Sequence, residues 1–171
     1  MHLIDGHKPC CGTSGLMNSI KYQLKLVEDS NCKCDCNHRY DTLKIGFLVK
    51  LKANLENRPK GSVVKYDDVI TNDGNCYTPS TGIFTAPAEG LYTFSWTSTT
   101  QANKYFFTYL AVNGNMIARN HAGHDTVNLS ASQTVVVHLK THDKINIKVQ
   151  DNIIGQFITS EGWSTFSGFM I

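Results

Sequence analysis

Residues 77–96 read YTPSTGIFTAPAEGLYTFSW, and this stretch decides the fold of the chain. Its second half alternates strictly: Tyr92, Phe94 and Trp96 are large aromatics, and the residues between them are small and polar. Side chains two apart on a β-strand lie on the same face, so the pattern predicts a strand that buries one aromatic face. A proline ends a shorter predicted strand over residues 82–86, because proline has no N–H to donate to a ladder.

Further short strands are predicted on both sides of this stretch. Asn113-Gly114 is a strong hairpin signal, because both residues tolerate the positive φ angles of a tight two-residue turn. No helix pattern appears after Ile45. Many short strands joined by turns are typical of a β-sandwich or jelly roll, so we expect an all-β domain. The other predicted strands cover residues 63–66, 68–70, 105–112, 116–119, 134–139, 144–149, 157–158 and 166–171.

The chain ends on the apolar sequence FSGFMI, residues 166–171, which predicts a C-terminal strand inside a sheet. Phe166 and Phe169 are expected to be core aromatics, like those of the alternating stretch. Removing residues 169–171 is therefore expected to unfold the domain. Each buried large apolar side chain contributes about 1.5–3 kcal/mol, against a total stability of about 5–15 kcal/mol.

The composition limits the class of protein. A chain of 171 residues with 41% hydrophobic content can bury the core of one domain and carry an appendage. The net charge of +2, and the lack of a basic cluster interleaved with aromatics along the sequence, argue against a nucleic-acid partner. No apolar run is long enough to cross a bilayer. The short motifs of common enzyme families are missing, which agrees with a protein that is not an enzyme.

The first forty residues differ in character from the rest. Met17, Ile20, Leu24 and Val27 are spaced three, four and three, which is the apolar seam of two heptads. A helix this short is marginal alone, because isolated helices below about 12–15 residues rarely hold in water. Two readings stay open: one amphipathic helix packed on the main domain, or a short coiled coil that oligomerises the chain.

Six cysteines are distributed unevenly, with five in the first 36 residues. Such crowding indicates metal or redox chemistry in a reducing compartment, and a disulfide framework in an oxidising one. Residues 1–9 lack the apolar core of a signal peptide. The chain is therefore either cytosolic or a mature form with Met1 added, and we favour the second. The cysteines are Cys10, Cys11, Cys32, Cys34, Cys36 and Cys76.

From about Leu43 onward, the order and spacing of several short motifs resemble the globular-head domain of complement component C1q, within the tumour-necrosis-factor-like jelly-roll superfamily. The resemblance covers about three quarters of the chain. The matching pieces are Ile45-Gly46-Phe47, Asn72-Asp73-Gly74 with Tyr77, residues 80–87, residues 90–94, Asn113-Gly114, residues 135–143, and Phe166-Ser167-Gly168-Phe169.

This resemblance implies a ten-stranded jelly roll over residues 43–171 that assembles as a homotrimer, is secreted and has no catalytic activity. Residues 1–40 would be a cysteine-rich helical stem that oligomerises the chain, because the sequence has no Gly-X-Y repeat for a collagen stem. The six cysteines then read as disulfides that can link the chain into higher oligomers. Cys76 is either part of this set or a small buried residue.

The family binds other molecules, so the resemblance implies a recognition protein of innate immunity that binds microbial surface carbohydrates or other repeated ligands. Two alternatives remain. One is an extracellular, mineral-associated protein that binds calcium or heavy metals. The other is a receptor-binding, cytokine-like ligand, which the fold alone does not reject.

Two groups of residues are candidate metal ligands. Family members that bind calcium use loop carboxylates and amides, and Gln150 and Asp151, with Glu161, offer such oxygens. Thiolates and imidazole suit soft metals such as zinc or copper, although the cysteine spacing is tighter than in most structural zinc sites. We favour disulfides for these cysteines. The soft-metal candidates are Cys32, Cys34, Cys36 and His38, joined by His7, Cys10 and Cys11.

Two further motifs carry possible chemistry. A loop is predicted after the strand over residues 116–119, and it contains His121, His124 and Asp125. These residues could form a metal site, but we favour a solvated loop. Asn128-Leu129-Ser130 is an acceptor triplet for N-glycosylation, usable only in a secreted protein of a eukaryote.

Overall fold

A computed structural model of the protein describes residues 44–151 and 157–171, and every regular element in these ranges is a β-strand. The expected all-β domain is confirmed. Among the described residues, no helix has the length and apolarity to span a bilayer. The predicted stem over residues 1–40, with its apolar seam and five of the six cysteines, lies outside the described residues, and the boundary at 43 stays a prediction.

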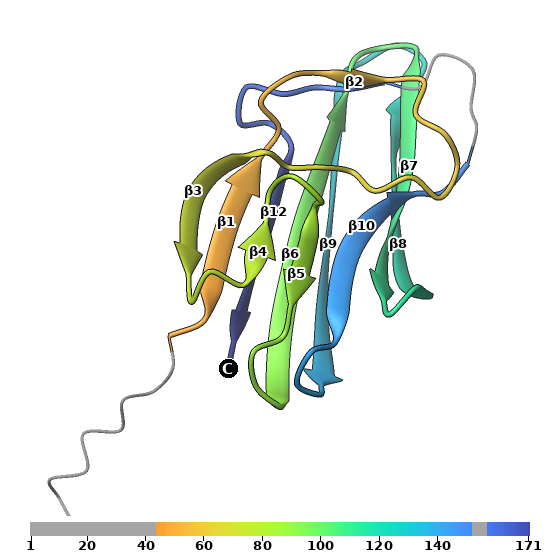
Figure 1. The fold of residues 1–171 in the computed structure, drawn as a ribbon. Helices are drawn as coiled ribbons and strands as arrows, with labels where there is room; N and C mark the ends of the chain where they lie inside the picture. The colour runs from red at the N-terminus through yellow and green to blue at the C-terminus, as the bar shows by residue number, and fades with distance from the viewer. Residues whose placement is uncertain (1–43, 152–156) are drawn as a thin grey trace, which may run out of the picture. The chain divides into compact units, whose positions relative to one another are not determined.

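Two antiparallel five-stranded sheets form the domain (Figure 1). The strand order of the first sheet is β3 (Asp68–Asp73), β1 (Gly46–Lys50), β12 (Thr165–Met170), β6 (Gly90–Thr100), β9 (Leu129–Leu139). The strand order of the second sheet is β4 (Tyr77–Thr78), β5 (Ile83–Thr85), β10 (Lys144–Val149), β7 (Lys104–Val112), β8 (Asn115–His124).

The two sheets lie face to face, and in Figure 1 β5 and β10 lie in front of β6 and β9. A separate short pair, β2 (Leu55–Glu56) with β11 (Phe157–Ile158), adds a two-stranded sheet. The ten strands of the main sheets confirm the expected ten-stranded jelly roll.

Strand β6 has the alternation that its sequence predicts. Tyr92, Phe94 and Trp96 all point inward and are fully buried. The buried indole N–H of Trp96 donates to Thr108 Oγ1 at 3.0 Å, which links β6 in the first sheet to β7 in the second. A buried donor without a partner costs free energy, so this contact also satisfies the one polar atom of the Trp96 side chain.

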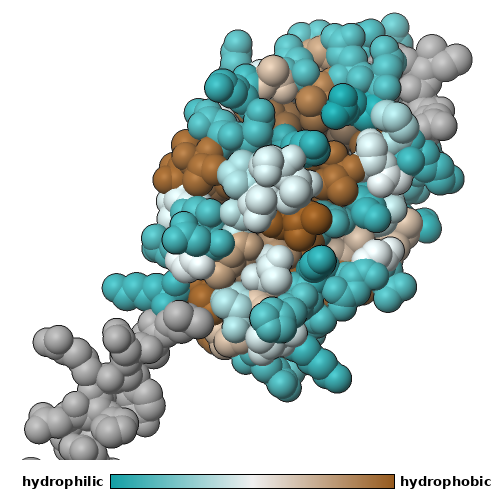
Figure 2. All heavy atoms as spheres, viewed as in Figure 1, coloured by the Kyte–Doolittle hydropathy of each residue, from teal (hydrophilic) through white to brown (hydrophobic). Residues whose placement is uncertain are grey.

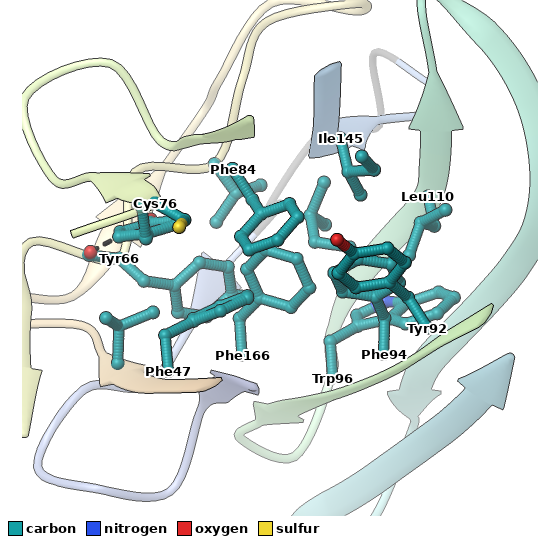
Figure 3. Packing of buried hydrophobic residues seen from close by; sticks show 14 of the residues in the cluster. Phe47, Tyr66, Cys76, Phe84, Tyr92, Phe94, Trp96, Leu110, Ile145 and Phe166 are labelled. Carbon is teal, nitrogen blue, oxygen red and sulfur yellow. Dashed lines mark hydrogen bonds between the residues drawn. The ribbon is translucent and has the colours of Figure 1, made fainter. Parts of the chain in front are cut away.

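Aromatic rings from the two sheets meet in the centre of the domain and point toward one another (Figure 3). Phe47 on β1 meets Phe166 on β12 edge-on at 4.9 Å between ring centroids, and Phe84 on β5 meets Phe94 on β6 at 5.3 Å. Gly168 leaves the space that these rings need, because a Cβ there would lie 2.4 Å from Phe94 Cδ1. Such edge-on pairs add to the stabilisation from simple burial.

The predicted strand over residues 63–66 is not a strand in the structure. Only Val63 forms a ladder contact, an isolated bridge to Lys148 of β10, and the Val64 N–H donates to the Ile147 carbonyl at 2.8 Å. Val64 and Tyr66 are nevertheless buried. This segment therefore packs against the core without forming a continuous ladder.

The C-terminal strand lies where the sequence predicts, between β1 and β6. The prediction that Phe169 is a core residue is wrong, since its side chain is 54% exposed. Phe166 and Phe169 are three positions apart on one strand, so they must point to opposite faces. Phe166 takes the inner face and is fully buried.

Outside the core, the surface is mixed. The face drawn in Figure 2 is mostly hydrophilic or of intermediate hydropathy, and its hydrophobic residues form separate patches.

Phe166 is the best single test of this core. We expect Phe166→Ala to lower the free energy of unfolding by about 3–5 kcal/mol, because it leaves a cavity between the sheets. Ser167→Ala, the adjacent outward position, is the control and is expected to change it by about 0.5 kcal/mol or less. Urea melts at one protein concentration measure both values. Equal effects of the two variants would contradict the inward orientation of Phe166.

Candidate binding site

A pocket of about 310 Å³ opens at the end of β6, where β6 pairs with the start of β9. Its lining is uncharged and consists of hydroxyl groups, amides and one indole. Ligand pockets usually measure about 300–1,000 Å³, so this one suits a small group. The lining residues are Thr99, Thr100, Gln101, Asn128, Ser130, Thr159 and Trp163.

Thr99 organises the lining of the pocket. Its hydroxyl donates to the Trp163 carbonyl at 2.9 Å and lies 2.7 Å from Ser130 Oγ. Because the Thr99 proton goes to the carbonyl, Ser130 donates to Thr99, which leaves the lone pairs of Ser130 Oγ as acceptors. The Thr99 N–H donates to Ser164 Oγ at 3.0 Å, so the backbone here is held as well. The lining is therefore ordered before any ligand arrives.

A tight turn over residues 160–163 presents the indole of Trp163. Glu161 and Gly162 both have positive φ, 56° and 83°, and the Trp163 N–H donates to the Ser160 carbonyl at 3.1 Å. Two consecutive positive φ values are those of a type I′ turn, which glycine adopts without strain. Asn54 Oδ1 accepts from both the N–H and the hydroxyl of Ser160, at 2.7 and 2.8 Å, and anchors the turn.

Trp163 is 62% exposed beside this polar lining. The chain has two tryptophans, and the other, Trp96, is fully buried. Asn128 uses its Oδ1 to accept from the Ala102 N–H at 2.9 Å, which leaves its amide NH₂ as a donor. An exposed ring face beside uncharged donors and acceptors can hold a flat molecule that has an apolar face and a hydroxylated edge.

A second surface feature lies on the outer face of the first sheet. Phe169 on β12 and Val136 on β9 lie on either side of Thr93 in the same row of the sheet, and both are exposed. Leu91 and Ile171 are also exposed, and the Ile171 N–H donates to the Leu91 carbonyl. We call Leu91, Val136, Phe169 and Ile171 the apolar face. Clustered exposed apolar residues of this kind mark interaction surfaces.

Residues 46–171 match the family model of the C1q domain. The chain belongs to the C1q domain family. Its resemblance to the globular head of complement component C1q is thereby confirmed.

Among curated proteins, the chain is 31% identical over 130 residues to the "heavy metal-binding protein HIP" of the mussel Mytilus edulis. The match covers 74% of this chain, and the chain spans 60% of the length of that relative.

Solved structures share the C1q-type fold at low identity. The globular domain of zebrafish complement 1qA superimposes with a TM-score of 0.63 at 20% identity, covering 75% of this chain and 98% of that one. Murine APRIL gives a TM-score of 0.59 at 11% identity, over 75% of this chain and 99% of that one. The Eiger TNF of S. frugiperda gives 0.61 at 9%, over 75% and 92%. At these identities the matches establish the fold and nothing finer.

The residues predicted to bind calcium in this C1q domain lie at the end of β10. Gln150 follows the strand, and its Oε1 is buried with no hydrogen-bond partner among the described residues. Asp151 Oδ1 lies 3.4 Å from Lys60 Nζ, an ion pair that a calcium ion would displace. No cluster of three or more His, Cys, Asp or Glu side chains appears in residues 44–151 and 157–171. The calcium site stays a prediction.

The structure corrects the position of the two histidines. His121 and His124 lie on β8, which runs to His124, and not in a loop. The His121 ring stacks on Phe107 at 4.1 Å, whereas His124 Nδ1 accepts from the Thr126 N–H at 3.1 Å. Residues three apart on a strand point to opposite faces, so this pair is a poor metal site.

Cys76 is a buried thiol in the C1q domain. Its Sγ–H donates to the Gly74 carbonyl at 3.0 Å, and burial raises the pKa of the thiol. A neutral thiol is a poor nucleophile and metal ligand. Within the described residues it has no disulfide partner. The five cysteines of residues 1–40 lie outside them, so a pairing with the stem stays a prediction.

The sequence did not identify Thr99 and Trp163 as pocket residues, or Phe169 as a surface residue. The sequence did carry a signal for Trp163, because it follows Gly162 between the predicted strands over residues 157–158 and 166–171 and therefore has no strand partner to bury it. The glycosylation candidate Asn128 is exposed and lines the pocket.

Proposed function

We propose that this C1q domain protein is a secreted, oligomeric recognition protein of innate immunity. Its heads bind carbohydrate groups of microbial surfaces in the Trp163 pocket, and the oligomer converts weak single contacts into useful avidity. The observation that carries this proposal is the exposed indole beside an uncharged lining of hydroxyls and amides.

The chemistry of the pocket fits a neutral sugar. A pyranose ring has an apolar C–H face that stacks on an indole, and its hydroxyls both donate and accept hydrogen bonds. Ser130 supplies an acceptor and Asn128 supplies donors, as their internal hydrogen bonds leave these groups available. Because no lining residue is ionisable, binding needs no charge on the ligand.

Oligomer formation is supported by the apolar face. Large exposed apolar residues are unfavourable on a monomer, and a second copy of the chain is the partner always present at equal concentration. The family resemblance implies a trimer. Linking several weak sites can raise overall binding by about 10²–10⁴ without any new contact.

Replacing the indole tests the pocket. We expect Trp163→Ala to lose binding on a glycan array and to abolish the sugar-induced change in exposed tryptophan fluorescence, since Trp96 is buried. Ile117→Ala, an exposed apolar residue on β8, is the control and is expected to bind as the wild type does. Array binding that survives Trp163→Ala undiminished would refute the pocket.

Charged substitutions test the oligomer. Phe169→Asp with Val136→Asp is expected to dissociate the reduced full-length protein in analytical ultracentrifugation, because a carboxylate buried between copies is costly. Binding to a multivalent surface should fall far more than binding to a monovalent sugar. Met116→Asp, exposed on the other sheet, is the control. An unchanged sedimentation coefficient for the double variant would rule out the apolar face as the interface. Removing residues 1–40 should likewise weaken multivalent binding most.

A second candidate function is metal binding. It is supported by the name of the mussel relative, a heavy metal-binding protein, and by the five cysteines near the N-terminus. In this reading the cysteine-rich segment holds a soft metal through thiolates. The cytokine-like alternative has only the fold in its favour.

Calorimetry distinguishes metal binding by the N-terminal cysteines from disulfide bonds formed by the same cysteines. If the thiols bind zinc, the reduced full chain releases heat on titration, and combined Cys32→Ser, Cys34→Ser and Cys36→Ser substitutions remove it, whereas Cys76→Ala does not. A calcium titration whose heat is lost in Asp151→Asn would support the loop after β10. If the reduced chain releases no heat on zinc titration, the soft-metal function is rejected. A disulfide-linked band on a non-reducing gel would support disulfides between the stem cysteines.

A further inference from the structure

The strands of the second sheet carry a one-sided charge. The chain has 14 Asp and Glu residues, yet β4, β5, β7, β8 and β10 contain none of them. The same strands contain Lys104, Arg119, Lys144 and Lys148. The strands of the second sheet therefore carry an excess of positive charge, although the net charge of the whole chain is only +2.

Cross-strand register brings two of these cations to either side of one aromatic ring. Lys148 on β10 is paired with Tyr109 on β7, and Tyr109 is paired with Arg119 on β8. Directly paired residues point to the same side of a sheet. The neighbours of Tyr109 on β7, Thr108 and Leu110, are fully buried, so this row points outward. Neither cation has an ion-pair partner among the described residues.

Two further aromatic rows continue along β7. Phe107 stacks on His121 with 26° between the rings, and the Tyr105 ring centroid lies 6.3 Å from that of Phe107. The Tyr105 ring covers Gly123, where an added Cβ would lie 2.2 Å from Tyr105 Cδ1. The Tyr105 ring therefore lies over the backbone of β8, whereas the Phe107 ring, at 79° to it, stacks against the ring of His121.

A single described carboxylate contacts this row of rings. Asp125 accepts a hydrogen bond from the Tyr105 hydroxyl, and this bond raises the pKa of the phenol. The carboxylate lies beside Tyr105, at the opposite end of the aromatic row from Arg119 and Lys148. Arg119 and Lys148, at the other end, form no ion pair with a carboxylate among the residues described.

We propose that this cationic aromatic face, made of Tyr105, Phe107, Tyr109, Arg119, His121 and Lys148, binds an anionic linear polysaccharide bearing sulfate or uronate groups. Arg119 and Lys148 hold the anionic groups, and the aromatic rings of β7 contact the apolar faces of successive sugars. Outward residues on one strand recur about every 6.6–6.8 Å, so β7 offers a straight track to an extended polymer. This ligand differs from the neutral sugar of the Trp163 pocket, and the two sites are independent.

Two other polyanionic partners are less compatible with the face. A bilayer binds through exposed apolar side chains that insert into it, whereas Tyr105, Phe107 and Tyr109 are half-buried. A nucleic acid would use the same cations and rings. We favour the polysaccharide because it is found outside cells, and this preference rests on the extracellular role given under the proposed function.

Charge reversal on the full-length protein tests the face, with heparin as the sulfated probe and dextran as the neutral one. We expect Arg119→Glu with Lys148→Glu to weaken heparin binding at least tenfold at 0.15 M salt and to reduce the slope of log K against log salt by about two. Lys52→Glu with Lys65→Glu changes the net charge equally at exposed positions elsewhere and is expected to weaken binding less than threefold.

Several outcomes would overturn the proposal. Equal losses of heparin affinity in both double variants would show non-specific electrostatic attraction. Failure of the wild-type protein to bind heparin at 0.15 M salt would refute the proposed ligand. A single-stranded oligonucleotide or phosphatidylserine vesicles bound more tightly than heparin through Arg119 and Lys148 would reassign it. Neutral-sugar binding should survive Arg119→Glu with Lys148→Glu, so failure of this face and failure of the pocket are distinguishable. Unchanged urea melts confirm that the variants fold.

Discussion

Aromatic packing between the two sheets is the constraint on which the rest of this domain depends. Phe84 from the second sheet lies 5.3 Å, between ring centroids, from both Phe47 and Phe94 of the first sheet, and Gly168 leaves these rings the room to pack. A shift of one residue in any of these strands would turn the rings to solvent, because strand side chains alternate. The core therefore sets the register of both sheets.

That register decides which residues remain for recognition. Each strand that buries one face must present the other, so the outer face of the first sheet carries Phe169 and Val136, and that of the second carries Arg119 and Lys148. Beyond Trp96, β6 ends in hydroxyl residues, and Thr99, on the opposite side of the strand from Trp96, organises the pocket lining. One core thus yields an apolar face, a cationic face and an uncharged pocket, three surfaces with different ligand chemistry.

Local patterns predicted much of the fold, because they depend on neighbouring residues alone. The aromatic alternation of β6, the Asn113-Gly114 hairpin and the C-terminal strand are all confirmed. Prediction failed where the outcome depended on distant partners. Residues 63–66 were predicted as a strand, yet they meet the edge of β10 at a single bridge. His121 lies on β8 because that strand follows β7 well beyond the predicted end.

The sequence by itself determined the all-β class and the C1q resemblance, since both follow from short motifs whose meaning is local. Only the tertiary structure decided which residues come together in the candidate binding sites. Trp163 and Thr99 are 64 positions apart and meet through a hydrogen bond from the Thr99 hydroxyl to the Trp163 carbonyl. Arg119 and Lys148 flank Tyr109 only because β8 and β10 both pair with β7. Long-range strand pairing joins residues that no local pattern connects, and recognition surfaces are built from such pairs.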